Sequence, residues 1–313
     1  MKGTSAACAR RWLVSVALGA SACQRRAPAP AAVERAALAA TPVASAIVPA
    51  APADAGIDRR RPAPPDVAGP PADASATPSG LRTKVLQPGG GTHHPGQSDF
   101  VEVAYSGWRR NGLFFEGTGD GERVRFDRDE IIPGLNEGIG LMVAGEKRRF
   151  WIPLALAYAA RPHHVNAPHE DMTFDVELLR IIPPPSVPAD VAAPPKAASR
   201  TKSDLRYQYL HRGSGTTHPT SESWIQIRQS IWTPKGKLFY TSLRVSDVMR
   251  TPVGDLCPGV QEMIVRLVEG DRVRLWLPGK LAFGEPQPGQ EPQPFSAPLG
   301  PVVIDLELVK IGD

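Results

Sequence analysis

Two short stretches of the chain, 130–145 and 255–270, share a pattern of apolar positions that predicts a short helix. The apolar residues recur at i, i+4 and i+7 in both stretches, as Leu135, Ile139 and Met142 in the first and Val260, Ile264 and Leu267 in the second. A Pro-Gly pair precedes each pattern, and a glycine ends it. A helix this short is not stable alone, so we expect other elements to wrap around each copy.

The regions around the first stretch alternate between apolar and polar residues with the period of a β-strand. The alternation covers 101–105, 123–126, 150–152 and 174–178. Turn residues such as Asn111-Gly112 lie between these regions, as expected for antiparallel strands with one solvated face. The predicted fold class is therefore α+β, a curved antiparallel sheet wrapped around one short α-helix.

The same pattern occurs twice. Residues 79–95 are matched by residues 203–219, with an offset of 124 residues, and Phe174-Asp175-Val176-Glu177-Leu178 corresponds to Ile304-Asp305-Leu306-Glu307-Leu308 with an offset of 130. Two copies of this length indicate tandem domains. We assign them to residues 79–181 and 203–313, joined by a Pro/Ala-rich linker at 182–202.

The residues before the first domain predict export. Lys2, Arg10 and Arg11 precede an apolar run that is too short for a membrane span, which is typical of a signal peptide over residues 1–23. The small residues before Cys23 resemble a bacterial lipobox, which would make Cys23 a lipidation site. The alternative is an ordinary Ala-x-Ala cleavage site that happens to precede a cysteine. Residues 24–78 are Ala/Pro-rich and are expected to be a disordered tether.

Composition and charge argue against several classes of partner. The 36 basic and 32 acidic residues are interspersed, with a net charge of +4, so we expect no nucleic-acid partner. No Cys-x-x-Cys occurs among the three cysteines, and the adjacent pairs His93-His94 and His163-His164 lack nearby ligand partners, so we expect no metal and no cofactor. Cys257 is expected to be a buried apolar residue, with a reactive thiol as the alternative.

Five motifs of the first domain occur in the order and spacing of a known family. They are Val103-Ala104-Tyr105-Ser106-Gly107, Asn111-Gly112-Leu113-Phe114-Phe115-Glu116, Ile131-Ile132-Pro133-Gly134-Leu135, Ile152-Pro153 followed by Ala157-Tyr158, and Phe174-Asp175-Val176-Glu177-Leu178. This ordered set resembles the FKBP-type peptidyl-prolyl cis-trans isomerases. The resemblance implies a catalyst of Xaa-Pro rotation that acts through an apolar cradle and needs neither a nucleophile nor a metal.

The resemblance also implies the site residues. The implied catalytic residues are Tyr105, Phe115, Tyr158 and Phe174, and the implied substrate-binding residues are Glu116, Phe126, Ile131, Ile132, Leu135 and Val165. The Ile132 amide and the Tyr158 hydroxyl are the implied hydrogen-bond partners of the substrate. For Phe126 and Phe174, ordinary core packing is the alternative interpretation.

The first domain departs from the family pattern at the pocket. Leu135 stands where the family usually has Trp, Glu116 where it has Asp, and Val124 where it has an aromatic residue. A shallower pocket follows, which should weaken macrolide binding more than isomerisation.

The second domain departs further. Gln229, Tyr240, Phe283 and Ile304 stand at the positions of Tyr105, Glu116, Tyr158 and Phe174. Loss of both hydroxyl groups favours a binding or dimerising module over an enzyme. The loop from Glu285 to Pro298 is expected to lie at the mouth of this second pocket and to cap it.

Two functions are compatible with the sequence. The first is a prolyl isomerase that assists the folding of exported, proline-containing polypeptides in the periplasm or at the outer membrane, or as a secreted soluble protein. The second is a catalytically weak chaperone or scaffold in which both domains only bind apolar or proline-containing segments.

Overall fold

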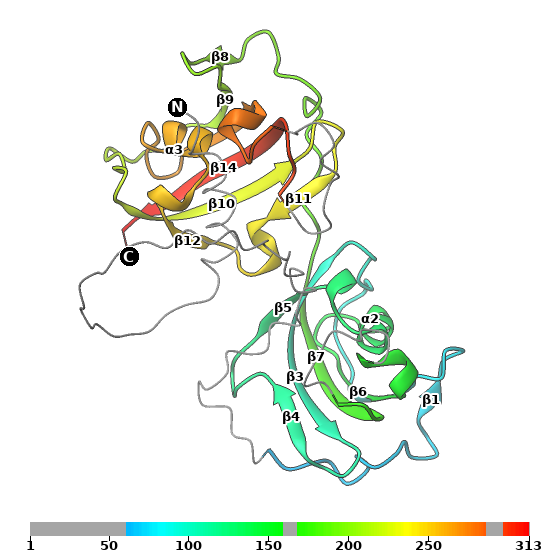
Figure 1. The fold of residues 1–313 in the computed structure, drawn as a ribbon. Coiled ribbons are helices and arrows are strands. Elements are labelled where there is room, and N and C mark those ends of the chain that lie inside the picture. The colour runs from blue at the N-terminus through cyan, green and yellow to red at the C-terminus, as the bar shows by residue number, and fades with distance from the viewer. Residues whose placement is uncertain (1–60, 159–167, 286–296, 313) are drawn as a thin grey trace, which may run out of the picture. The chain divides into compact units, whose positions relative to one another are not determined.

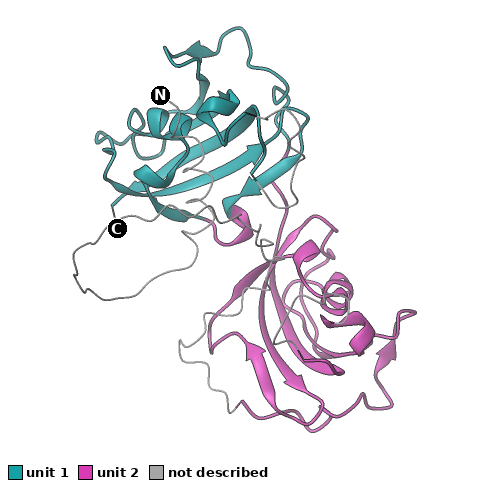
Figure 2. Ribbon diagram, viewed as in Figure 1, with its two compact units in different colours: residues 1–43, 187–242, 248–313 teal, residues 44–186, 243–247 magenta. Residues whose placement is uncertain are grey.

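The computed structural model describes residues 61–158, 168–285 and 297–312 of the chain (Figure 1). The chain divides into two compact units, one of residues 44–186 and 243–247 and the other of residues 1–43, 187–242 and 248–313 (Figure 2). We call them the first and the second domain in the order of their sheets along the chain. Within the described ranges, no helix is long and apolar enough to cross a membrane.

The first domain is an antiparallel sheet that curves around one helix (Figure 1). Its elements are β1 (Ser75–Ala76), β2 (Arg82–Gln87), β3 (Phe100–Arg109), β4 (Phe114–Gly117), β5 (Val124–Asp127), α2 (Pro133–Gly140), β6 (Lys147–Ile152) and β7 (Met172–Ile182). The strand order is β1-β2-β6-β7-β3-β4, and β5 also pairs with β3. The predicted α+β fold class is thereby confirmed.

The second domain repeats this architecture. Its elements are β8 (Ser199–Arg200), β9 (Arg206–His211), β10 (Trp224–Trp232), β11 (Leu238–Thr241), β12 (Met249–Pro252), α3 (Pro258–Ile264), β13 (Arg272–Leu277) and β14 (Val302–Ile311). The order β11-β10-β14-β13-β9-β8, with β12 paired to β10, is that of the first domain. The two sequence copies therefore correspond to two copies of one fold.

The Pro-Gly pairs lie where each helix meets the sheet. Pro133 is the first residue of α2, where its missing N–H is not needed for an intrahelical hydrogen bond. A Cβ atom on Gly134 would lie 2.4 Å from Ile152 Cγ2 in β6, and one on Gly259 would lie 2.6 Å from Leu277 Cδ2 in β13. Only glycine allows this approach, which buries the predicted apolar stripe, including Ile139 at 0% exposure.

The folded domains include Pro-rich segments that the sequence-based boundaries place in the tether and in the linker. Residues 61–78 were assigned to the disordered tether, but the structure packs them against the first sheet, where β1 pairs with β2. The Trp151 indole N–H donates to the Asp66 carbonyl at 2.8 Å. Residues of the linker 182–202 pack on the second sheet in the same way, and Trp276 donates to the Asp190 carbonyl at 3.0 Å. Both segments are therefore parts of the folded domains.

We expect Gly134→Ala to destabilise the first domain by about 1–3 kcal/mol, because the new methyl group would force α2 away from Ile152. The measurement is the urea dependence of amide hydrogen exchange in β6, which reports on this domain alone. Gly90→Ala is the matched control, because no atom lies within 4 Å of a Cβ atom built there. Equal stability of the two variants would contradict the role given to Gly134.

Candidate functional site

The aromatic residues implied by the resemblance form one cluster on the concave side of the first sheet. The rings of Tyr105 and Phe126 are 5.6 Å apart, and Phe115 meets Phe174 edge to face, also at 5.6 Å. Phe126 and Phe174 are 3% and 0% exposed and belong to the hydrophobic core. The core interpretation therefore holds for both rings, which at the same time contact the residues of the candidate site.

Close ring packing depends on a glycine in β3 that sequence reasoning did not single out. A Cβ atom on Gly107 would lie 2.7 Å from Phe174 Cε1 and 3.1 Å from Phe115 Cζ. A glycine within a strand indicates that another group approaches the backbone closely, so the sequence did contain this signal. Gly107 thereby leaves space for the two rings.

Glu116 and Tyr158 are joined at the polar edge of the cluster. The Tyr158 hydroxyl donates to Glu116 Oε1 at 3.0 Å. Burial raises the pKa of the Glu116 carboxyl to about 7, and the hydrogen bond from Tyr158 opposes this shift. Burial, together with the nearby Glu116, also raises the pKa of Tyr105. The Tyr105 hydroxyl is therefore neutral near pH 7.

The floor of the site is the start of α2. Ile131, Ile132 and Leu135 are each at most 2% exposed. Ile132 is the N-cap residue and has an extended backbone, and within the part of the chain that the structure describes its N–H donates to no acceptor. The first turn of a helix leaves such donors available for a ligand carbonyl.

A buried arginine missed by sequence reasoning fixes this helix. Arg128 is 4% exposed and donates to the carbonyls of Pro95 at 2.8 Å, Gly96 at 2.7 Å and Asn136 at 2.8 Å. Arg128 thereby connects the loop before β3 to a backbone carbonyl of α2. Its role depends on distant backbone groups, so local sequence patterns carried no signal for it.

The corresponding region of the second domain has different chemistry. The Tyr240 hydroxyl donates to Met249 Sδ at 3.4 Å, and the rings of Phe239 and Phe283 are 6.0 Å apart. Gln229 is 3% exposed, and its Nε2 has no hydrogen-bond partner among the described residues. Ile231 replaces Gly107 and is 1% exposed, so a branched side chain occupies the strand position where the first domain leaves space.

Some residues singled out in the sequence lie outside the cluster or outside the described residues. Val165 lies in the range 159–167, which is outside the described residues. Cys23 is also outside them, in the range 1–60. The greater part of the expected capping loop of the second domain, 286–296, is likewise outside them. Cys257 is 4% exposed, as expected for a buried apolar residue.

Comparison with known proteins finds relatives of the first domain. The family described as FKBP-type peptidyl-prolyl cis-trans isomerase matches residues 91–179. The FKBP-type isomerase FkpA of Aeromonas hydrophila is 37% identical over 110 residues, which are 35% of this chain and 41% of that protein. The outer membrane protein MIP of Legionella longbeachae is 35% identical over 108 residues, which are 33% of this chain and 45% of that protein.

The structural match covers a similar part of the chain. The crystal structure of FkpA from Escherichia coli is 34% identical and matches 37% of this chain and 54% of that one, with a TM-score of 0.34. The chain thus spans about half the length of the relatives it matches. The matched residues carry α2, the aromatic cluster and the Tyr158–Glu116 hydrogen bond, and over residues 91–179 the chain is similar to the FKBP-type peptidyl-prolyl cis-trans isomerases.

Proposed function

We propose that the first domain catalyses cis–trans isomerisation of Xaa-Pro bonds in polypeptide substrates. The observation that carries this proposal is the aromatic cluster with two hydrogen-bond donors at its edge, the Ile132 N–H and the Tyr158 hydroxyl. The match of residues 91–179 to the isomerase family supports it. The departures at Leu135, Glu116 and Val124 leave the ring contacts of Phe115, Tyr105 and Phe174 in place.

An apolar site with hydrogen-bond donors at its edge is suited to rotation about an Xaa-Pro amide bond. Rotation about the amide bond faces a barrier of ~18–20 kcal/mol, because resonance is lost in the twisted state. The planar amide is more polar than the twisted one, so an apolar surface that removes water favours the transition state. The Ile132 N–H and the Tyr158 hydroxyl would hold the carbonyls on either side of the proline. Tyr158 must then exchange Glu116 for the substrate as its acceptor.

The second domain is proposed to bind peptides without catalysing isomerisation. It keeps the core of the fold but has Gln229 and Phe283 in place of the two tyrosines. The buried Gln229 Nε2 without a partner among the described residues supports a binding role, because a peptide carbonyl there would satisfy it. The alternative function, a chaperone or scaffold in which neither domain catalyses, differs only in the activity of the first domain.

The proposed place of action is outside the cytoplasm, with the protein held at a membrane through a lipid on Cys23. The basic and apolar pattern of residues 1–23 supports export, and the name of the Legionella relative is that of an outer membrane protein. The proposed substrates are exported polypeptides that contain proline. Macrolides are expected to bind only weakly, because Leu135 replaces the usual aromatic floor.

The catalytic proposal predicts that the full chain accelerates isomerisation of an Ala-Leu-Pro-Phe peptide and that Phe115→Ala lowers kcat/KM at least tenfold, a loss of ~1.4 kcal/mol or more. The matched control is Phe239→Ala at the same position of the second domain, which should leave kcat/KM unchanged. A chain without activity, or equal losses in the two variants, would favour the scaffold alternative.

The raised pKa of Glu116 predicts that rising pH destabilises the protein. Between pH ~4.5 and ~7 the folded carboxyl keeps its proton while the unfolded one loses it, so the free energy of unfolding falls with pH. The full effect is ~3 kcal/mol above pH 7. Urea unfolding of wild type and Glu116→Gln at pH 4.5 and 8 measures it. The decrease with pH should be smaller in the variant, and parallel curves would refute the assignment.

The anchor predicts that Cys23→Ala moves the protein from the membrane fraction to the soluble fraction of exported proteins. A thioether-linked lipid requires the cysteine sulfur, which alanine lacks. Fractionation followed by immunoblotting measures the change, and Cys257→Ala is the matched control. Persistence of Cys23→Ala in the membrane pellet would rule out this anchor.

A further inference from the structure

The two Pro-rich segments that pack on the sheets are copies of one another. We call residues 61–78 the first arm and residues 187–201 the second arm. The first contains Pro64-Pro65-Asp66-Val67-Ala68, and the second contains Pro188-Ala189-Asp190-Val191-Ala192, with the same offset of 124 residues that relates the start of the two domains. The repeat therefore begins upstream of the sheets and includes the arms.

The first arm contacts the face of the sheet opposite α2. Side chains alternate along β6, so Phe150 and Ile152 face the core while Arg149 and Trp151 face away from it. Arg149 pairs with the Asp66 carboxylate through one nitrogen and holds Asp175 through the two others, one of them at 2.7 Å. The Trp151 N–H binds the backbone carbonyl of the same Asp66.

The second arm makes the same contacts in its own domain. Arg274 pairs with the Asp190 carboxylate and with Asp305, the latter at 2.8 Å. The Trp276 N–H donates to the Asp190 carbonyl. Two segments far apart in the sequence are thus held by matching arginine, tryptophan and aspartate residues.

The valine that follows each aspartate also has a matching place. A Cβ atom built on Gly112 would lie 3.9 Å from Val67 Cγ1, and one built on Gly236 would lie 4.0 Å from Val191 Cγ1. Both glycines have positive φ, 85° and 81°, in the turn between two strands. Val191 joins Trp232, Trp276 and Val303 in a hydrophobic cluster separate from the main core. Each arm is thus held by an ion pair, a hydrogen bond to a backbone carbonyl and an apolar contact.

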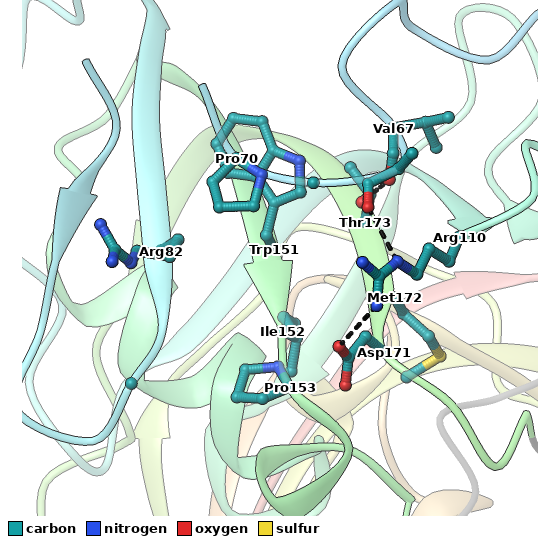
Figure 3. Close-up of a pocket in the computed structure, with 13 residues that line it drawn as sticks. Val67, Pro70, Arg82, Arg110, Trp151, Ile152, Pro153, Asp171, Met172 and Thr173 are labelled. Carbon is teal, nitrogen blue, oxygen red and sulfur yellow. Dashed lines mark hydrogen bonds and ion pairs between the residues drawn. The ribbon is translucent and has the colours of Figure 1, made fainter. Parts of the chain in front are cut away.

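The first arm leaves space beside it. A cavity of about 160 Å³ is lined by Val67–Pro70 of the arm and by Trp151, Arg110 and Asp171 of the sheet and its loops (Figure 3). The Thr173 hydroxyl donates to the Val67 carbonyl at 2.9 Å, and Arg110 Nε donates to the Ala68 carbonyl at 2.9 Å. This part of the arm, upstream of β1, is thus held on the sheet through its backbone carbonyls, and strand pairing begins only at β1.

We propose that this face of each sheet is a peptide-recognition site for a Pro-x-Asp-Val-Ala segment, which the chain's own arms occupy. The site is separate from the aromatic cluster, which lies on the other face of the sheet. Its ligand class is a proline-flanked peptide that turns at its Asp-Val pair, as both arms do, with the Val67 N–H donating to the Pro64 carbonyl and the Val191 N–H donating to the Pro188 carbonyl, each at 3.1 Å. Proline restricts the backbone of such a peptide and lowers the entropy lost when it binds in the turn. Because the receptor residues match, an arm of either repeat fits either domain.

The two sites differ in their polar contacts. Thr173 and Arg110, which donate to carbonyls of the first arm, correspond to Val303 and Pro234 of the second domain. The Trp108 N–H donates to the Arg61 carbonyl at 3.2 Å, while the Trp232 N–H has no partner among the described residues. The first domain should therefore bind a given arm peptide more tightly than the second.

The test uses the full chain with one arm weakened. Asp66→Ala removes the ion pair of the first arm, and Asp190→Ala is the matched variant of the second. A fluorescein-labelled peptide of residues 61–73 is titrated by fluorescence anisotropy into wild type and both variants, because in wild type the tethered arms compete at high effective concentration. We expect each variant to bind the peptide at least tenfold more tightly than wild type does, with Asp66→Ala the tighter of the two.

Two further measurements make the result specific. The same peptide with Asp66→Asn should bind at least tenfold more weakly, and adding Arg149→Met to the Asp66→Ala chain should abolish the gain. Circular dichroism checks that the variants are folded. A folded Asp66→Ala chain that binds no more peptide than wild type, or binding that does not depend on the peptide aspartate, would overturn the proposal. A peptide of residues 187–197 should compete for the same site.

Discussion

The approach of one short helix to the sheet is the contact on which both domains depend. The second residue of each helix is glycine because Ile152 in one domain and Leu277 in the other lie where its side chain would be. The approach buries the apolar stripe of a helix of 8 or 7 residues, too short to be stable alone. It also places the N-terminal turn of α2, with the Ile132 N–H, beside the aromatic rings. Fold and candidate site thus share one packing constraint.

The two domains show how one core can carry different side chains at the candidate site. Where the first domain has Gly107 and Phe174, the second has Ile231 and Ile304, all in the same strand pair. The exchange replaces ring packing against a bare backbone by aliphatic packing, which preserves the burial of the strands. A similar compensation occurs in the helix, where Gly138 lies against Phe150 while Met263 and Leu275 stand at the matching positions. The strands and the helix thus stay buried in both domains while the side chains at the candidate site differ.

The sequence predicted what local periodicity encodes. The stripe of Leu135, Ile139 and Met142 and the alternation in β3 and β6 were sufficient for the fold class, and motif order was sufficient for the aromatic cluster. The arms were assigned to linkers because Ala/Pro-rich sequence has no periodicity, and because Asp66 acquires its partner Arg149 only through a contact 83 residues away. The repeat of Pro-x-Asp-Val-Ala was the signal available, since the match between the two halves continues upstream of Ser79.

The docked first arm determines how a pulling force would enter the first domain. The chain reaches this domain at Arg61, which bonds to Ser106 in β3 and to Asp120, rather than at Ser79 beside β2. Tension applied from the N-terminal side would therefore load the Asp66–Arg149 ion pair and the carbonyl contacts of the arm before any hydrogen bond of the sheet. These contacts would yield first and lengthen the connection by the residues of the arm. Under such a load the ion pair and carbonyl contacts of the arm would break before the sheet opens.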